Sequence, residues 1–354
     1  MSRFFSEKYK TLEPYTPGEQ PQDMQYVKLN TNESPFPTSP KAVAAAAEAA
    51  ERLRLYSDPE CKLLTEKFCE VFGVAKNEVL FTNGSDEILN FAFMAYCDDA
   101  HPAAFPNISY GFYPVFAEIN RVPYTEIPLR DDFNIDVDDY CGLGKTIFIA
   151  NPNAPTGIAL KPSEIERILR SNPNNVVVID EAYVDFGAES CLPLVTKYDN
   201  LLVAQTFSKS RSMAGARLGF GVGNPDLIRD LNTIKYSTNP YNINSMTMAA
   251  GIGVLSDEEY TRKNCLAIQE NRAFTVDALR RMGFTVVDSV ANFIFAKHAS
   301  VDGETIYRKL KALGVLVRHF TKPAIKDYNR ITIGTREQMQ TLLDTLKTIL
   351  EEES

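Results

Sequence analysis

Short apolar runs alternate with longer helical patterns through the middle of this 354-residue chain. This alternation is typical of an α/β domain, in which helices cover both faces of a buried and mostly parallel sheet. We expect strands of that sheet at EVLF (78–81), TIFIA (146–150), VVVID (176–180), LLVAQ (201–205) and RLGFGVG (217–223). With 44% hydrophobic residues, a chain of this length can bury the sizeable core that such a sheet requires.

The pattern changes near residue 245. A long charged helical segment is followed by NFIFAKH, an amphipathic helical pattern, VLVRHF, NRITIGT and a terminal helical pattern, which together indicate a smaller α+β unit. Earlier in the chain, Ser39, Pro40 and the alanines after them predict the start of a helix. We therefore expect an N-terminal arm (1–40) packed on the small unit, a large α/β domain (41–244) and a small α+β domain (245–354).

Charge and composition exclude several classes of protein. The formal net charge is −9 and the lysines and arginines are scattered, so the chain lacks the positive surface that nucleic acids and anionic membranes require. The first ten residues contain no apolar segment of a signal peptide, and no stretch approaches the roughly 20 apolar residues of a membrane span, so we expect a cytoplasmic protein. The histidines lie far apart and no two cysteines have CxxC spacing, so we expect no metal site and reduced cysteines.

A lysine follows one of the predicted strands in TFSKSRSMAGARLGF (206–220). Lys209 lies between two serines in a segment of small residues, which would let a ligand approach its amine. A desolvated lysine of this kind can act as a nucleophile and form a Schiff base, although a lone lysine is more often a surface residue. Thr206, Ser208 and Arg217 could donate hydrogen bonds to one phosphate group beside it.

An acid ends another predicted strand in VVIDEAYVDF (177–186). In open α/β sheets ligands bind beyond the carboxyl ends of the strands, so we expect Asp180 and Lys209 to face one crevice. Pyridoxal phosphate requires such a set: a lysine for its aldehyde, donors for its phosphate, and a carboxylate that keeps its ring nitrogen protonated. We expect Asp180 to pair with that nitrogen and Tyr183 to hydrogen-bond the ring oxygen.

A glycine turn follows the first predicted strand in FTNGSDEIL (81–89). Gly84 permits a tight turn, and Ser85 can cap the helix after it. The backbone N–H groups of Ser85 and Asp86 would then lie at the positive end of a helix, where an anion such as the cofactor phosphate binds. Most Gly-Ser turns are only helix caps, so this motif carries weight only beside Lys209 and Asp180.

Along nearly the whole chain, the ordered motifs resemble those of the fold-type I aminotransferases, which use pyridoxal phosphate, and among these the histidinol-phosphate aminotransferases. The ordered set is more specific than any one motif. Its members are LNTNESPFPTSP, LYSDPECKLLTEKF, NGSDEIL, SYGFYPVFAE, NPNAPTG, IDEAY, TFSKSRSMAGARLGF, NPYNINS and NRITIGT. The resemblance implies amino transfer between L-histidinol phosphate and 2-oxoglutarate, in histidine biosynthesis.

The resemblance also implies roles for individual residues. Those that match the catalytic positions of the family are Lys209, Asp180 and Tyr183. Those that match its cofactor contacts are Gly84, Ser85, Asp86, Tyr110, Asn153, Asp180, Tyr183, Thr206, Ser208, Lys209, Arg217 and Tyr56. Those that match its contacts with the substrate, chiefly with its anionic group, are Arg330, Arg318 and Asn30. Tyr110 would stack on the cofactor ring, and Tyr56 would reach it from the second subunit of a homodimer.

One position departs from the family pattern. Many members carry asparagine directly before the Pro-Thr-Gly of NPNAPTG, where it hydrogen-bonds the ring oxygen of the cofactor, but this chain has Ala154. The loss of such a neutral hydrogen bond costs about 1 kcal/mol. We therefore expect Tyr183 to carry more of that interaction, with the neighbouring Asn153 as a marginal contact.

Other functions share some of these features. A threonine-phosphate decarboxylase or an aromatic aminotransferase would have the same cofactor residues, and the LNTNESP segment favours the histidinol-phosphate branch. A non-catalytic cofactor-binding regulator is disfavoured by the intact lysine, aspartate and arginines and by the lack of a DNA-binding segment. A nicotinamide enzyme is excluded, because GFGVG (219–223) lies inside an apolar strand instead of a strand-to-helix turn.

Overall fold

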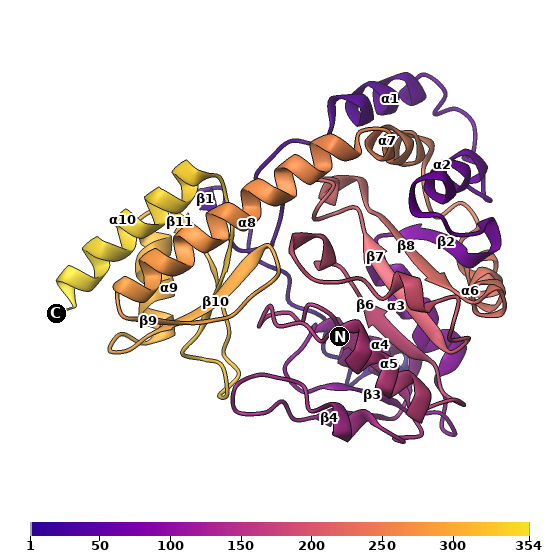
Figure 1. Ribbon diagram of the computed structural model, residues 1–354, viewed down its shortest axis with the longest axis horizontal. Helices are drawn as coiled ribbons and strands as arrows, with labels where there is room; N and C mark the ends of the chain where they lie inside the picture. The colour runs from indigo at the N-terminus through magenta and orange to yellow at the C-terminus, as the bar shows by residue number, and fades with distance from the viewer. Residues whose placement is uncertain (1, 354) are drawn as a thin grey trace.

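A seven-stranded sheet forms the centre of the large domain in the computed structural model, which describes residues 2–353 (Figure 1). Its strands are β2 (Val79–Asn83), β3 (Ala103–Pro106), β4 (Tyr124–Ile127), β5 (Thr146–Ala150), β6 (Val177–Asp180), β7 (Leu201–Thr206) and β8 (Leu218–Gly223). Their order is β2-β8-β7-β6-β5-β3-β4, and β8 alone runs antiparallel to its neighbours. The expected α/β class with a mostly parallel sheet is confirmed.

Strands β3 and β4, and the antiparallel orientation of β8, were not predicted from the sequence. β3 (AAFP) is a short buried run that contains two alanines and a proline, whereas β4 (YTEI) has polar residues in its middle and is mostly exposed at the edge of the sheet. β8 is antiparallel because its connection from Thr206 to Leu218 is too short for the crossover of a dozen or more residues that a parallel neighbour needs. This reversal brings the start of β8 to the edge where β7 ends.

Helices cover both faces of this sheet. They are α1 (Pro40–Ala50), α2 (Lys62–Phe72), α3 (Ser85–Tyr96), α4 (Phe112–Asn120), α5 (Pro162–Ser171), α6 (Pro225–Thr238) and α7 (Ser245–Leu255). Side chains alternate along each strand, so Ile147 and Ile149 of β5 pack in a core with α5, whereas Phe148 packs in the opposite core with α3 and α4. Burial on both faces explains the continuous apolar runs.

The C-terminal unit is a four-stranded antiparallel sheet, ordered β12-β13-β10-β9, packed against helices. Its elements are α8 (Glu258–Arg281), β9 (Phe284–Val287), β10 (Phe293–His298), α9 (Gly303–Ala312), β11 (Val315–Leu316), β12 (Arg318–His319), β13 (Asn329–Thr332) and α10 (Arg336–Glu352). The arm strand β1 (Val27–Lys28) pairs in parallel with β11, and Leu29 enters the core of this unit. The arm therefore packs against the C-terminal unit.

Helix α7 packs in the core of the large domain, although the sequence placed it with the C-terminal unit. Val254 and Leu255 join the cluster that contains Leu64 of α2. Gly253 lies so close to α1 that a Cβ atom there would be 2.7 Å from Ala42 Cα. The core boundary therefore falls after α7, and α8 runs from there to the C-terminal unit (Figure 1).

Local signals explain several element ends. Ser39 caps α1 as expected, because its hydroxyl accepts a hydrogen bond from the Lys41 N–H at 3.2 Å, and Pro40 is the first helical residue. Short 3-10 helices are η1 (Glu7–Tyr9), η2 (Lys76–Glu78), η3 (Val137–Tyr140), η4 (Val184–Phe186), η5 (Leu192–Leu194) and η6 (Ala214–Ala216). Within residues 2–353, no helix has the length and apolarity of a membrane span, and no group of His, Cys, Asp and Glu side chains could hold a metal ion.

Candidate active site

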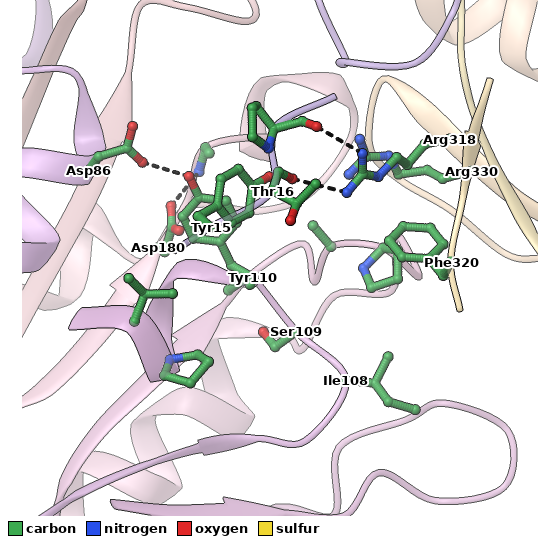
Figure 2. A pocket seen from close by; sticks show the side chains of 18 of the residues that line it. Tyr15, Thr16, Asp86, Ile108, Ser109, Tyr110, Asp180, Arg318, Phe320 and Arg330 are labelled. Carbon is green, nitrogen blue, oxygen red and sulfur yellow. Dashed lines mark hydrogen bonds between the residues drawn. The ribbon is translucent and has the colours of Figure 1, made fainter. Parts of the chain in front are cut away.

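A cavity of about 960 Å³ opens at the edge of the large sheet where β5, β6 and β7 end. These strands are neighbours in the sheet, so their carboxyl ends lie side by side. The arm and the C-terminal unit complete the wall (Figure 2). The expected site residues that line this cavity are Ser85, Asp86, Tyr110, Asp180, Tyr183, Thr206, Ser208, Lys209, Arg217, Arg318 and Arg330.

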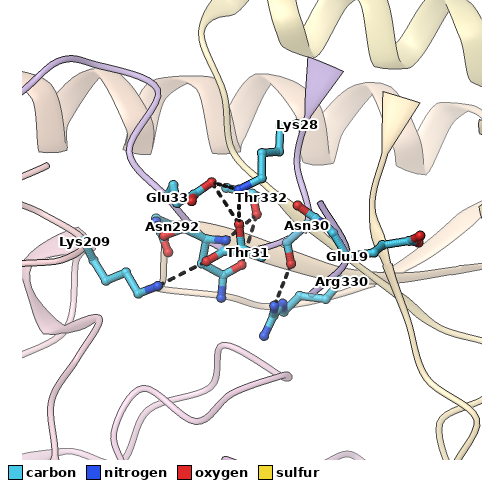
Figure 3. A network of polar contacts seen from close by, with 10 residues as sticks. Glu19, Lys28, Asn30, Thr31, Glu33, Lys209, Asn292, Arg330 and Thr332 are labelled. Atoms are coloured by element: carbon cyan, nitrogen blue, oxygen red, sulfur yellow. Dashed lines mark hydrogen bonds and ion pairs between the residues drawn. The ribbon is translucent and has the colours of Figure 1, made fainter. Parts of the chain in front are cut away.

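Lys209 lies in the loop between β7 and β8. Its Nζ donates a hydrogen bond to the Thr31 carbonyl oxygen at 3.1 Å (Figure 3) and lies 5.7 Å from the ring centre of Tyr183. Burial, followed by the nearby Arg330 guanidinium, lowers the pKa of Lys209 to about 8. About a tenth of the amine is therefore neutral at pH 7, far more than for an ordinary lysine, and this neutral form is the nucleophile.

Asp180 ends β6 and is 5% exposed. The Tyr113 hydroxyl donates to its Oδ2 at 3.2 Å, and the Ala182 N–H donates to its Oδ1 at 3.2 Å. No cation of the described chain pairs with this carboxylate, and burial raises its pKa to about 7. A positive charge placed in the cavity would therefore stabilise the ionised form of Asp180.

The N-terminus of α3 forms a cradle for an anion. Gly84 is its N-cap residue with φ 76°, and Ser85 is the first helical residue, whereas the sequence analysis had expected Ser85 to be the cap. Because Gly84 has no side chain to occupy them, the first N–H groups of the helix remain available to a ligand. The side-chain donors that line the cavity beside this terminus are Thr206, Ser208 and Arg217.

Asp86 orients two side chains of this cradle. Its Oδ2 lies 2.9 Å from Arg217 Nη2, and its Oδ1 accepts a hydrogen bond from the Tyr110 hydroxyl at 2.6 Å. The guanidinium is thereby held beside the helix N-terminus. The Tyr110 ring is held as an aromatic wall of the cavity (Figure 2).

These features fit pyridoxal phosphate, the cofactor expected from the sequence. A buried acid without a cationic partner suits a protonated ring nitrogen, and an uncapped helix N-terminus beside Arg217 suits a phosphate. An amine with a lowered pKa suits an aldehyde. Asp180, Arg217 and Lys209 line one cavity, so a single ligand could reach all three.

Arg330 on β13 places positive charge on the side of the cavity opposite Asp86 and Asp180 (Figure 2). Its Nη2 donates to the Asn30 carbonyl oxygen at 2.9 Å (Figure 3), while its buried Nε has no hydrogen-bond partner among residues 2–353. Burial lowers the pKa of Arg330, and no carboxylate in the described part of the chain pairs with it. A buried guanidinium without a counter-ion favours the binding of an anion.

Arg318 on β12 is the cross-strand neighbour of Arg330 and holds the arm. Its Nη1 and Nη2 donate to the carbonyl oxygens of Pro17 and Thr16, each at 3.1 Å (Figure 2). The adjacent Tyr15 lines the cavity, and burial raises the pKa of its hydroxyl. The sequence predicted the arm as a packing segment and did not indicate Tyr15 as a residue of the site.

Several expected contacts do not line the cavity. The Asn30 side chain instead donates to the Glu19 carbonyl oxygen of the arm at 2.8 Å, and the Asn153 side chain donates to the Ile108 carbonyl oxygen at 2.9 Å. Tyr56 is 85% exposed and lies outside the cavity of its own chain. Gly84 acts through its backbone alone. The structure therefore gives Asn30 and Asn153 supporting positions.

Two neighbours of the catalytic residues come from the arm and were not found from the sequence. The Thr31 carbonyl accepts the Lys209 hydrogen bond, and Asn32 Nδ2 donates to the Tyr183 hydroxyl oxygen at 3.0 Å. Both residues lie in LNTNESP. The sequence signal that could have indicated Thr31 and Asn32 is that this polar stretch has no helical or strand periodicity. Its polar groups must therefore form hydrogen bonds with other parts of the fold.

Comparisons with known proteins agree with this geometry. Residues 24–346 match the family Aminotransferase class I and II. The histidinol-phosphate aminotransferases of Brachyspira hyodysenteriae and Marinomonas sp. are 48% and 47% identical to this chain over 353 residues, covering 99% of it and 100% of each relative. The crystal structure of histidinol-phosphate aminotransferase from Sinorhizobium meliloti in complex with pyridoxal-5'-phosphate has a TM-score of 0.85 at 20% identity, covering 93% of this chain and 92% of that one. The resemblance found in the sequence is confirmed, and the chain belongs to the class I and II aminotransferases.

Proposed function

We propose that this aminotransferase acts in the cytoplasm and transfers an amino group between L-histidinol phosphate and 2-oxoglutarate, with pyridoxal phosphate as cofactor. The products are imidazole acetol phosphate and L-glutamate, in histidine biosynthesis. The observation that carries the proposal is the position of Arg330, whose guanidinium lacks a carboxylate partner and lies across one cavity from Asp180. The sequence identity of 48% and 47% to full-length proteins named histidinol-phosphate aminotransferase supports the choice of substrate.

Three residues would hold the cofactor: Asp180 at its ring nitrogen, Arg217 at its phosphate and Lys209 at its aldehyde carbon. Bound there, pyridoxal phosphate supplies a protonated ring that withdraws electrons from the substrate carbon carrying the amine. Asp180 would keep the proton on the ring nitrogen, because an ionised carboxylate beside that nitrogen stabilises its protonated, cationic form. Lys209 Nζ, freed by the substrate amine, would act as the base that takes the proton from that substrate carbon and then as the acid that passes it to the former aldehyde carbon of the cofactor.

The arginine pair would select the substrate by its anionic group. Histidinol phosphate has no α-carboxylate, so its phosphate is the group that Arg330 binds, with Arg318 as a second donor. Each charge-assisted hydrogen bond contributes about 1.5–3 kcal/mol. In the second half-reaction the same guanidinium binds the α-carboxylate of 2-oxoglutarate.

The active form would be a homodimer in which Tyr56 completes the cofactor site of the other subunit. This assignment follows the family resemblance, and two observations support it. Tyr56 is remote from the cavity of its own chain, and its exposed ring stacks on Tyr241 with the ring centres 4.6 Å apart.

The test is a comparison of kcat/KM for histidinol phosphate, histidinol, threonine phosphate and phenylalanine in three proteins: wild type, Arg330→Ala, and Arg308→Ala as a matched control on the exposed side of α9. We expect wild type to prefer histidinol phosphate over histidinol by about 10²-fold or more, because histidinol has no phosphate and cannot form these contacts. Arg330→Ala should compress that ratio, and Arg308→Ala should retain it. A preference for phenylalanine would replace the substrate but keep amino transfer, whereas carbon dioxide release from threonine phosphate would favour a decarboxylase.

A further inference from the structure

An asparagine of the arm is held between the C-terminal unit and Tyr183. Asn32 is 1% exposed and has a left-handed backbone with φ 56°. Its N–H donates to Thr332 Oγ1 at 3.0 Å, and its Oδ1 accepts a hydrogen bond from the same hydroxyl at 3.1 Å. Its carbonyl accepts from Asn292 Nδ2 at 2.9 Å, and its own Nδ2 donates to the Tyr183 hydroxyl oxygen at 3.0 Å. Thr332 and Asn292 belong to the network drawn in Figure 3.

The hydrogen bonds that link Thr332, Asn32 and Tyr183 have one consistent donor-to-acceptor direction. The backbone N–H of Asn32 can only donate, so Thr332 Oγ1 accepts there and its own proton goes to Asn32 Oδ1. The structure places the oxygen of the Asn32 amide at Thr332 Oγ1 and its NH₂ group at Tyr183. The Tyr183 oxygen accepts this bond, so the single hydroxyl proton of Tyr183 must point elsewhere.

The surroundings of Tyr183 leave the cavity as the place for that proton. Among residues 2–353 the Tyr183 hydroxyl has no hydrogen-bond partner besides Asn32, and the side chain lines the cavity. Its ring packs against Phe293 at a centre distance of 4.9 Å, in an apolar cluster with Ala154 and Ala291, and none of these side chains can accept a proton. Burial raises the pKa of Tyr183, which keeps the hydroxyl protonated.

We propose that Asn32 is a positioning residue, which occupies the acceptor side of the Tyr183 hydroxyl and aims its proton at the ring oxygen of bound pyridoxal phosphate. This inference rests on the proposed function and on the sequence-based expectation that Tyr183 hydrogen-bonds that oxygen. A donated hydrogen bond stabilises negative charge on the ring oxygen, and it therefore lowers the pKa at which the Lys209-linked cofactor loses its proton. Asn32 changes that pKa without touching the cofactor.

The test is the pH titration of the visible absorbance of the Lys209-linked cofactor. Asn32→Gly and Asn32→Asp are suitable variants, because both residues tolerate a positive φ. Asn32→Gly removes the donor and should raise the titration pKa by about 0.5–1 unit, which corresponds to one neutral hydrogen bond. Asn32→Asp replaces the donor with an acceptor that draws the hydroxyl proton away, so the rise should be at least as large. Asn271→Ala is the control: Asn271 is a buried asparagine that donates to the Gly334 carbonyl at 3.0 Å, and its loss should leave the titration unchanged.

Repeating the Asn32 substitutions in a Tyr183→Phe background separates positioning from general damage. Tyr183→Phe alone should raise the titration pKa, and Asn32→Gly should then add nothing. Circular dichroism establishes that each variant is folded, and Asn32→Asp, which has nearly the same shape as the native residue, carries the test if the glycine variant is unstable.

The outcomes distinguish this inference from the proposed function. If Tyr183→Phe shifts the titration and neither Asn32 variant does, or if the Asn32 shift persists without the tyrosine hydroxyl, the positioning role is overturned while the assignment of Tyr183 stands. If Tyr183→Phe leaves the titration unchanged, the assignment of Tyr183 to the ring oxygen is overturned, and the role of Asn32 with it.

Discussion

Asp180 and Glu181 are adjacent buried carboxyl groups, and they differ in what surrounds them. Glu181 accepts hydrogen bonds from the Ser190 hydroxyl at 2.6 Å, the Cys191 N–H at 2.5 Å and Gln205 Nε2 at 2.8 Å, and it does not line the cavity. Asp180 accepts hydrogen bonds from only one tyrosine hydroxyl and one backbone N–H. Burial raises the pKa of each to about 7, but only Asp180 is open to a ligand in the cavity.

Asp180→Asn should stabilise the cofactor-free protein at high pH. The pKa of Asp180 rises from 3.8 to about 7 on folding, so the stability it contributes as a neutral acid is complete below pH 3.8 and is lost as the pH rises through 7. The variant cannot ionise, so its advantage over wild type should grow by about 1–3 kcal/mol between pH 5 and pH 8. Urea denaturation of both cofactor-free proteins at the two pH values measures this difference. A difference that does not change with pH would contradict the buried, unpaired state of Asp180.

The sequence was sufficient to find Asp180 and Lys209, because each follows a continuous apolar strand and the carboxyl ends of such strands meet at one edge. It was not sufficient for Tyr15 and Asn32. Their contacts depend on how the arm packs against the C-terminal unit, and no local pattern of side chains encodes that packing. Asn30 was selected from the correct segment, but its side chain holds the arm and does not line the cavity.

At the scale of elements, β8 and the turn from β2 into α3 approach each other closely. A Cβ atom on Gly219 of β8 would lie 2.4 Å from Gly84 C and 2.4 Å from Ser85 N, both of which are backbone atoms. The sequence predicted β8 as an apolar strand and excluded a nicotinamide-type glycine turn at this segment, and the structure confirms the strand, but the apolar pattern did not explain why glycines are needed in it. The glycines instead allow the antiparallel strand to support the anion cradle.

Gly219→Ala should weaken cofactor binding through this contact. The added methyl group cannot be accommodated by side-chain rotation, so β8 and the N-terminus of α3 must separate, at a cost of about 1–3 kcal/mol. We expect the dissociation constant for pyridoxal phosphate to rise about tenfold, since 1.4 kcal/mol corresponds to one decade. Gly215→Ala is the matched control, because no heavy atom lies within 4 Å of a Cβ atom built there. Equal affinities in the two variants, measured by absorbance titration, would refute a supporting role for this contact.

At the scale of the molecule, the substrate end of the cavity is assembled from segments at opposite ends of the chain. Arg318 holds the carbonyl of Thr16, which is 302 positions away, and Glu19 of the arm pairs with Tyr307 and Lys311 of α9. The sequence predicted that the arm packs on the small unit, but not that it closes the cavity. Closure arises from contacts between distant segments, which composition and periodicity do not describe.

An exposed apolar surface lies away from this cavity. Its members include Leu53 (55% exposed), Leu55 (56%), Tyr56 (85%) and Tyr241 (43%). The stacked pair of Tyr56 and Tyr241 joins the segment after α1 to the segment after α6. A group of large apolar side chains exposed on one chain is typical of a surface that another protein covers, which supports the proposed homodimer.

Mixing two inactive variants should therefore restore activity. In a dimer formed from one Lys209→Ala subunit and one Tyr56→Phe subunit, one of the two sites combines the intact lysine of one chain with the intact tyrosine of the other. With random subunit exchange, half of the dimers are mixed and about a quarter of all sites become functional. Lys209→Ala mixed with Asp180→Ala is the control, because both residues line the cavity of the same chain and no arrangement restores a complete site. The experiment requires that Tyr56→Phe alone be strongly impaired and that exchange be verified by differently tagged subunits. If exchange is complete and the Tyr56 mixture recovers no more activity than the control mixture, Tyr56 does not serve the neighbouring site.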